Sequence, residues 1–152
     1  MDTRFRFEGE EEASLEYMPL DLRRKLDLAA LRLSLAAWQA MSLDDRASLC
    51  AQDVTDDASA TAFRERVIAL ARAVGHDVPD SPKAATVWRE ASAPEAVVTR
   101  AAALGVDVGL AGWSSLDEAR RYALYRLADP RKQADKFRSA LEEFGLLRAP
   151  RA

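Results

Sequence analysis

One stretch of this chain restricts its fold more than any other, because apolar side chains recur in it at helical spacing from residue 59 to residue 74. Counted from the first of them, the apolar positions stand at intervals of 0, 4, 7, 8 and 11, and they are Phe63, Val67, Leu70, Ala71 and Val74. This spacing places them along one face of an α-helix. Gly75 follows at a position typical of a helix end. The segment predicts a helix whose apolar face is covered by neighbouring elements.

Other segments combine apolar periodicity with capping residues in the same way. Expected helices cover residues 19–31, 34–41, 42–50, 59–74, 84–90, 94–104, 116–128 and 130–145. Ser42 is expected to cap the third of these and Ser115 the helix over 116–128, because a hydroxyl accepts a hydrogen bond from a free N–H of the first turn. Asp129 is expected to cap the last helix, with Pro130 at its first position. Residues 106–112 are expected to be irregular because glycines interrupt them.

The composition supports an all-α fold, since alanine and leucine are abundant and β-branched residues are sparse. A length of 152 residues favours a single domain. We therefore expect one bundle of about six to eight helices over residues 19–147. Residues 1–18 are expected to form an extended N-terminal segment packed on it, in which Phe5 and Phe7 alternate with polar residues, and residues 148–152 a flexible tail.

Charge is unevenly distributed along the chain, although the net charge is only −3. Residues 1–80 carry 10 basic and 16 acidic side chains, whereas residues 81–152 carry 12 basic and 9 acidic ones. The C-terminal half therefore has a slight positive excess, which favours an acidic partner. The excess is far smaller than that of a dedicated nucleic-acid-binding protein, so no nucleic-acid partner is expected.

The location of the protein is expected to be cytoplasmic. No apolar run approaches the ~20 residues that a membrane-spanning helix needs, so no membrane partner is expected. The first residues, Met1 to Phe5, have no apolar signal core. One cysteine, Cys50, cannot form an internal disulfide, which fits a reducing compartment.

The sequence shows no pattern of residues that indicates catalysis, and no catalytic, cofactor-binding or metal-binding residue is predicted. His76 is the single histidine and lies in a Gly/Pro loop, where an ordinary exposed histidine is expected. Cys50 is expected to be a buried, unreactive thiol. Pairs of neighbouring acids fall at helix starts or on polar faces, where no desolvated pocket would tune them for acid–base chemistry. Glycines 105, 109 and 112 do not match a phosphate-binding loop.

Basic residues gather between positions 120 and 138. The simplest interpretation is a charged helix face with local ion pairs, for example from Asp117 to Arg121. The alternative is a docking patch for an acidic surface or a phosphorylated ligand. On that second interpretation we predict a partner-binding surface formed by Trp113, Arg120, Arg121, Arg126, Arg131 and Lys132. Tryptophan is usually a core residue in a chain of this size but is also a common interface anchor, and Trp113 is expected at the edge of the core.

Two regions of the sequence resemble the nitrate reductase associated protein family, small bacterial proteins known best from cyanobacteria. The first region contains Phe5-Arg6-Phe7-Glu8, the run Met18-Pro19-Leu20-Asp21-Leu22-Arg23-Arg24-Lys25-Leu26-Asp27, Leu33-Ser34-Leu35, Trp38, Leu43, Arg46 and Leu49. The second contains Trp113, Leu116, Arg121-Tyr122-Ala123-Leu124, Leu127, Phe137, Ala140-Leu141 and Glu143-Phe144-Gly145-Leu146. Members tend to carry a Cys-Gly pair shortly after the Lys-Leu-Asp triplet, where this chain has Leu28-Ala29-Ala30.

The resemblance implies an accessory role in nitrate assimilation, in which the protein binds nitrate reductase or its molybdopterin-maturation machinery without catalysing a reaction. It carries over no catalytic residue. An alternative from a different class is a carrier or enzyme for a phosphorylated pterin, in which the same arginines would hold the phosphate. A nucleic-acid-binding protein is a third hypothesis, and it predicts retention on DNA that falls steeply with salt.

Overall fold

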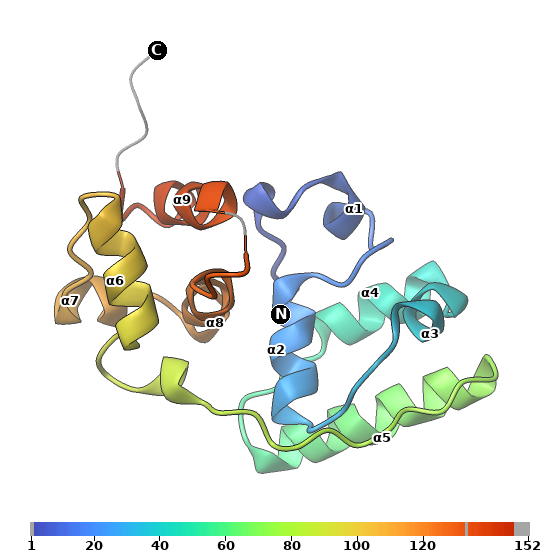
Figure 1. The fold of residues 1–152 in the computed structure, drawn as a ribbon. Helices are drawn as coiled ribbons and strands as arrows, with labels where there is room; N and C mark the ends of the chain where they lie inside the picture. The colour runs from blue at the N-terminus through green and yellow to red at the C-terminus, as the bar shows by residue number, and fades with distance from the viewer. Residues whose placement is uncertain (1, 133, 148–152) are drawn as a thin grey trace. The chain divides into compact units, whose positions relative to one another are not determined.

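A computed structural model describes residues 2–132 and 134–147, and Figure 1 shows their arrangement. All regular structure in these residues is helical, apart from an isolated antiparallel bridge between Leu31 and Asp80. The predicted all-α class is therefore confirmed. The described residues form nine α-helices and two 3-10 turns, slightly more than the six to eight expected, because several of the helices are short.

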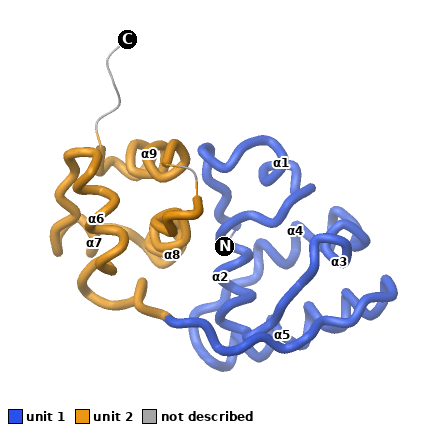
Figure 2. The backbone as a smooth tube through the Cα atoms, viewed as in Figure 1, with its two compact units in different colours: residues 1–85 blue, residues 86–152 orange. Residues whose placement is uncertain are grey.

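The chain forms two compact units, residues 1–85 and residues 86–152, which Figure 2 distinguishes by colour. Each unit has its own buried side chains. The single domain expected over residues 19–147 stays a prediction, because only folding cooperativity decides whether the two units form one domain. The tail expected at 148–152 lies outside the described residues.

The first unit contains six helical elements. They are η1 (Arg6–Glu8), α1 (Glu10–Ala13), α2 (Leu20–Leu28), α3 (Leu35–Ala40), α4 (Leu43–Ala51) and α5 (Asp57–Ala73). The apolar stripe predicted from Phe63 onward is confirmed on α5, where Phe63, Val67 and Ala71 are fully buried. Ser42 caps α4 as expected, since its hydroxyl accepts a hydrogen bond from the Asp45 N–H at 3.1 Å.

The second unit contains five helical elements. They are η2 (Val87–Arg89), α6 (Glu95–Ala103), α7 (Leu110–Ser114), α8 (Glu118–Leu127) and α9 (Ala134–Glu143). Its core is built on aromatic side chains, with Trp88 packed edge-to-face against Tyr122 at a ring distance of 5.4 Å. Trp113 and Phe137 are fully buried in the same unit. Helix α8 has five buried residues, more than any other helix of this unit, and it therefore lies at the centre of the core of this unit.

The extended N-terminal segment expected around Phe5 and Phe7 is wrong, because residues 6–8 form the 3-10 turn η1. The Glu8 carboxylate accepts hydrogen bonds from the backbone N–H groups of Phe5 and Leu20, at 3.1 and 2.7 Å. The two phenylalanine rings stack at 5.4 Å. The alternation of aromatic and polar residues therefore reflects ring stacking around a turn, and Glu8 ties this turn to the start of α2.

Two cap assignments near the C-terminus are also wrong. Asp117, and not Ser115, caps α8 by accepting the Arg120 N–H at 2.9 Å. Asp129 accepts the N–H of Arg131 at 2.9 Å and so stabilises its own turn, while α9 begins only at Ala134. In both cases a carboxylate accepts the free backbone N–H that lies nearest to it along the chain: Asp117 at the start of α8, and Asp129 within its own turn. The region expected to be irregular contains the short helix α7.

Candidate partner-binding surface

All six residues predicted to bind a partner lie in the second unit, on α7, on α8 and in the turn after α8. Their environments differ, however. Trp113 is fully buried, Arg120, Arg121 and Arg126 are half-buried, and Arg131 and Lys132 are exposed. Five of the six residues therefore divide into a structural group and an accessible group, and Arg120 belongs to neither.

Trp113 and Arg121 belong to the structural group. The exposed fraction of Trp113 is 0%, and its indole N–H donates to the Glu90 carbonyl at 3.0 Å. The Arg121 guanidinium lies 5.6 Å from the Trp113 ring centroid and donates to the Trp113 carbonyl at 3.2 Å. A second donation reaches the carbonyl of Arg89 at 3.4 Å. This arginine holds segments of the second unit together, and the tryptophan is a core residue.

The arginines of α8 do not share one face. At about 100° of rotation per residue, Arg120, Arg121 and Arg126 are separated by roughly 100° to 140° around the helix axis. Arg120 is further committed, since it pairs with Asp117 at 2.6 Å and lies over the Phe144 ring at 5.7 Å. A continuous arginine stripe along α8 is therefore absent from the described part of the chain.

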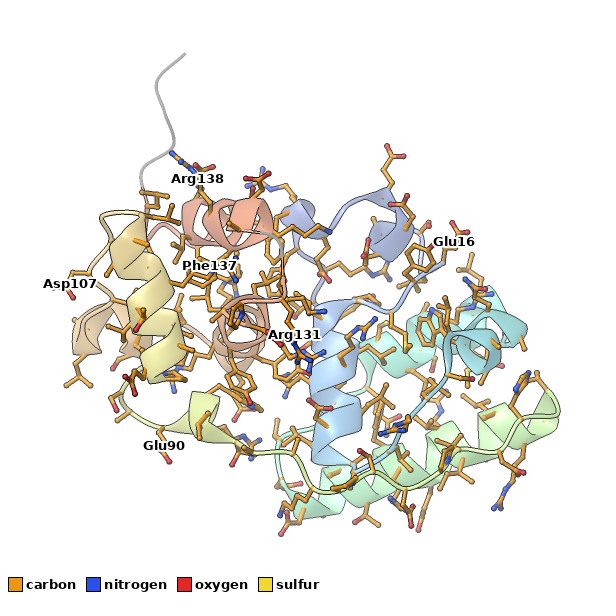
Figure 3. All side chains as sticks on the ribbon, viewed as in Figure 1. Glu16, Glu90, Asp107, Arg131, Phe137 and Arg138 are labelled. Atoms are coloured by element: carbon orange, nitrogen blue, oxygen red, sulfur yellow. The ribbon has the colours of Figure 1, made fainter. Side chains whose placement is uncertain are left out.

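The accessible group consists of Arg126, Arg131 and Lys132, which we call the basic turn. Arg126 lies in the last turn of α8, and the Lys132 N–H donates to the Asp129 carbonyl at 2.8 Å, which closes the following turn. The Arg131 side chain is 88% exposed and appears in the turn after α8 in Figure 3, well separated in that view from Arg138 on α9. The basic turn is the part of the predicted site that a partner can reach.

Charges within the basic turn are only partly neutralised. Arg131 pairs with Asp129 at 2.8 Å, and its hydrogen bonds hold the pKa of the Asp129 carboxyl well below its usual range. The side chain of Lys132 makes no hydrogen bond or ion pair within the described residues. The Nε of Arg126 is buried without a hydrogen-bond partner there. Within the described residues neither Lys132 nor Arg126 forms an ion pair with a carboxylate, although the charge of Lys132 helps to lower the pKa of Asp129.

A shallow groove of about 640 Å³ lies beside this turn, between α6 and the residues after α8. Its lining consists of Glu95, Ala96, Thr99, Arg100, Ala103, Ala128 and Pro130. The Arg100 guanidinium donates to the carbonyls of Leu127, Asp129 and Lys132, at 2.9, 2.7 and 2.9 Å. Arg100 therefore stabilises the turn after α8, because its N–H groups donate to the backbone oxygens of that turn.

The first unit contains a buried ionic cluster that the sequence analysis missed. Lys25 is fully buried on α2, with its Nζ 3.6 Å from Asp21 Oδ2 and 2.5 Å from the Cys50 carbonyl oxygen. Arg24 pairs with the same aspartate at 2.7 Å and donates to the Val54 carbonyl at 3.2 Å. The spacing of Asp21, Arg24 and Lys25 on one helix face was the available signal.

This cluster has a structural role. Burial lowers the pKa of Lys25, and the nearby Asp21 carboxylate opposes that effect. Both cations donate to carbonyls at or just after the end of α4, so they fasten α2 to that segment. Burial likewise raises the pKa of the Cys50 thiol to about 12, which makes it an unreactive core residue.

Over 2–132 and 134–147, no group of three or more His, Cys, Asp or Glu side chains is arranged to hold a metal ion. No helix in these ranges is long and apolar enough to cross a membrane. His76 lies in the loop after α5 and is half-buried.

These observations define a helical protein whose accessible candidate site is a charged surface. The chain belongs to the family of conserved nitrate reductase-associated proteins, whose model matches residues 4–144. The match covers nearly the whole chain and confirms the resemblance inferred from the two sequence regions. No curated protein and no solved structure shows a significant match to it.

Proposed function

We propose that this protein is a non-catalytic accessory or maturation factor, acting in the cytoplasm, that binds nitrate reductase or the machinery supplying its molybdopterin cofactor. Family membership carries this proposal, because the name of the family indicates an association with nitrate reductase. An accessory role by protein–protein contact is consistent with an accessible site made of charged side chains.

Within this proposal, the basic turn contacts carboxylates on the partner. Arginine forms bidentate pairs with carboxylates. Because the Arg131 side chain is 88% exposed and surface ion pairs are weak, Arg131 can exchange its partner Asp129 for another acid at little cost. Lys132 and Arg126 contribute further positive charge, since neither forms an ion pair within the described residues. Trp113 and Arg121 act indirectly, by holding the second unit in shape.

An affinity experiment tests the proposal. The purified chain is immobilised, exposed to extract from nitrate-grown cells of its own organism, and the retained proteins are identified by mass spectrometry. We expect enrichment of nitrate reductase or of a molybdopterin-handling enzyme. The double variant Arg131→Glu/Lys132→Glu should retain less, whereas Arg72→Glu/Lys83→Glu, which makes the same charge change at exposed positions of the first unit, should not. Recovery of neither enzyme by the wild-type chain contradicts the proposal.

The alternative, a carrier or enzyme for a phosphorylated pterin, requires arginine N–H groups directed at the ligand. Arg100 beside the groove and Arg121 on α8 both donate to backbone carbonyls instead. No specific observation therefore favours this alternative. Thermal stabilisation by a pterin in the absence of any protein partner would reverse this preference.

A further inference from the structure

We propose that the first unit carries a second binding surface, which takes a basic amphipathic helix of another protein. Three large apolar side chains of this unit are exposed to solvent: Tyr17 is 42% exposed, Leu35 41% and Leu43 58%. We call these three residues, together with their acidic neighbours Glu16, Asp44 and Asp45, the acidic–apolar surface. It lies in a different unit from the basic turn and is independent of the function proposed above.

Hydrogen bonds join the segments that carry the three apolar residues. The Leu15 carbonyl accepts from Trp38 Nε1 at 2.9 Å and from Arg46 Nη1 at 3.0 Å. The Gln39 side-chain amide donates to the Glu16 carbonyl at 3.1 Å. Residues 15–17 are thus fastened to both α3 and α4. Figure 3 shows Glu16 beside these helices.

The three apolar residues lie next to residues that make these hydrogen bonds. Leu35 shares a face of α3 with Gln39, four residues later, and Leu43 shares a face of α4 with Arg46, three residues later. Tyr17 directly follows Glu16. All three therefore belong to segments that meet at one junction between the loop, α3 and α4. Apolar exposure gathered in one region of a surface marks interaction sites.

Backbone strain maintains the arrangement. Leu15 has a φ of 63°, a left-handed conformation that is unfavourable for a non-glycine residue. Its side chain is buried, and its carbonyl is held by the two hydrogen bonds already described. The chain therefore turns sharply at Leu15, which places its leucine side chain in the core and Tyr17 in solvent. Strain that the surrounding structure enforces is characteristic of functional segments.

The charge around the junction defines the partner. Glu10, Glu11, Glu12 and Glu16 precede or enter the loop, with no basic residue between positions 8 and 17. Asp44 and Asp45 begin α4 beside Leu43. The Arg46 guanidinium donates to the carbonyls of Leu15, Gln39 and Met41, so it is turned toward the backbone. An apolar surface with an acidic border is complementary to a helix with apolar anchors and flanking lysines or arginines.

A peptide titration tests this proposal without nitrate reductase. The probe is a labelled peptide of about 18 leucines and lysines patterned as an amphipathic helix, and its control is a scrambled peptide of the same composition. Binding is measured by fluorescence anisotropy at about 0.15 M salt, and the contact site by chemical-shift changes in ¹⁵N-labelled protein. We expect the patterned peptide to bind at least about tenfold more tightly than the scrambled one, because only it presents an apolar face.

Variants locate the binding. Leu43→Ser and Tyr17→Ser should each weaken binding at least about fivefold, whereas Leu110→Ser should not, although Leu110 is a 64% exposed leucine of the second unit. Shift changes should centre on residues 15–17, α3 and the start of α4. Equal binding of the two peptides, unchanged binding of both variants, or shifts centred in the second unit would overturn the proposal. A dimer of the chain that Leu43→Ser dissociates would also overturn it, because a second copy would then be the occupant.

Discussion

Lys25 and Asp21 form a buried ion pair one helical turn apart on α2, with Nζ and Oδ2 3.6 Å from each other. The lysine also donates to the Cys50 carbonyl, and the aspartate also accepts from Arg24. Truncating Lys25 removes a buried hydrogen bond and leaves a cavity, so Lys25→Ala should lower the free energy of unfolding by about 3 kcal/mol or more.

Lys25→Met is the matched variant, because it keeps the side-chain length while Arg24 still neutralises Asp21. It should cost clearly less than Lys25→Ala in urea denaturation. Equal losses for the two variants would mean that charge, and not volume, dominates at this position.

Cys50 should make stability fall in alkaline solution. Burial raises the pKa of its thiol from 9.0 to about 12. Below pH 9 the thiol is protonated in both states and contributes nothing. Between pH 9 and 12 only the unfolded chain loses the proton, so the free energy of unfolding decreases as pH rises, by up to about 1.4 kcal/mol per pH unit.

Urea denaturation of the wild-type chain and of Cys50→Ala at about pH 8 and about pH 10.5 measures this effect. The wild-type chain should lose more stability between the two values than the variant does. Parallel losses would show that the thiol ionises as readily in the folded chain as in the unfolded one.

Ala30 should be better replaced by glycine. It has a φ of 55° and closes α2 with hydrogen bonds from Ala30 N–H to Asp27 and from Leu31 N–H to Leu26, the pattern in which glycine is usual. Ala30→Gly should stabilise the chain by about 0.5–1 kcal/mol, because relief of the left-handed strain exceeds the added entropy of the unfolded state.

Gly75 provides the opposite control at the end of α5. Its φ is +85°, and a Cβ added there would meet nothing within 4 Å, so Gly75→Ala tests conformation alone. It should destabilise the chain by about 1 kcal/mol in the same urea assay. A shift in the same direction for both variants would contradict this account.

Arg121→Glu should destabilise the second unit, because it removes two hydrogen bonds to backbone carbonyls and the cation over Trp113. We expect a loss of about 2 kcal/mol. Arg131→Glu should leave thermal stability nearly unchanged, because the Arg131 side chain is 88% exposed and solvent screens its pairing with Asp129. If both variants have the melting temperature of the wild-type chain, Arg121 does not hold the segments of the second unit together.

The sequence predicted the helical class and the main helices, because apolar spacing and caps are local properties. The α5 stripe and the Ser42 cap are examples. It failed where two local signals competed, as at Asp129, whose carboxylate satisfies its own turn and not α9. The turn η1 depended on Glu8 reaching Leu20, 12 residues away, which no local pattern records.

The candidate site was predictable only in part for the same reason. Arg121 and Arg131 are indistinguishable as residue types, yet one donates to the carbonyl of Arg89, 32 residues away, and the other points into solvent. Trp113 was expected at the edge of the core and is completely buried. Trp113 is buried because it lies on helix α7, and this helix was not predicted because Gly109 and Gly112 favoured an irregular segment.

Direct binding to nitrate reductase is the central claim, and a titration of the labelled chain with the purified enzyme of its own organism tests it most directly. We expect saturable binding that weakens at higher salt, about tenfold weaker for Arg131→Glu/Lys132→Glu and within about twofold of the wild type for Arg72→Glu/Lys83→Glu. A folded wild-type chain that does not bind the enzyme in either its apo or its cofactor-loaded form would contradict the claim.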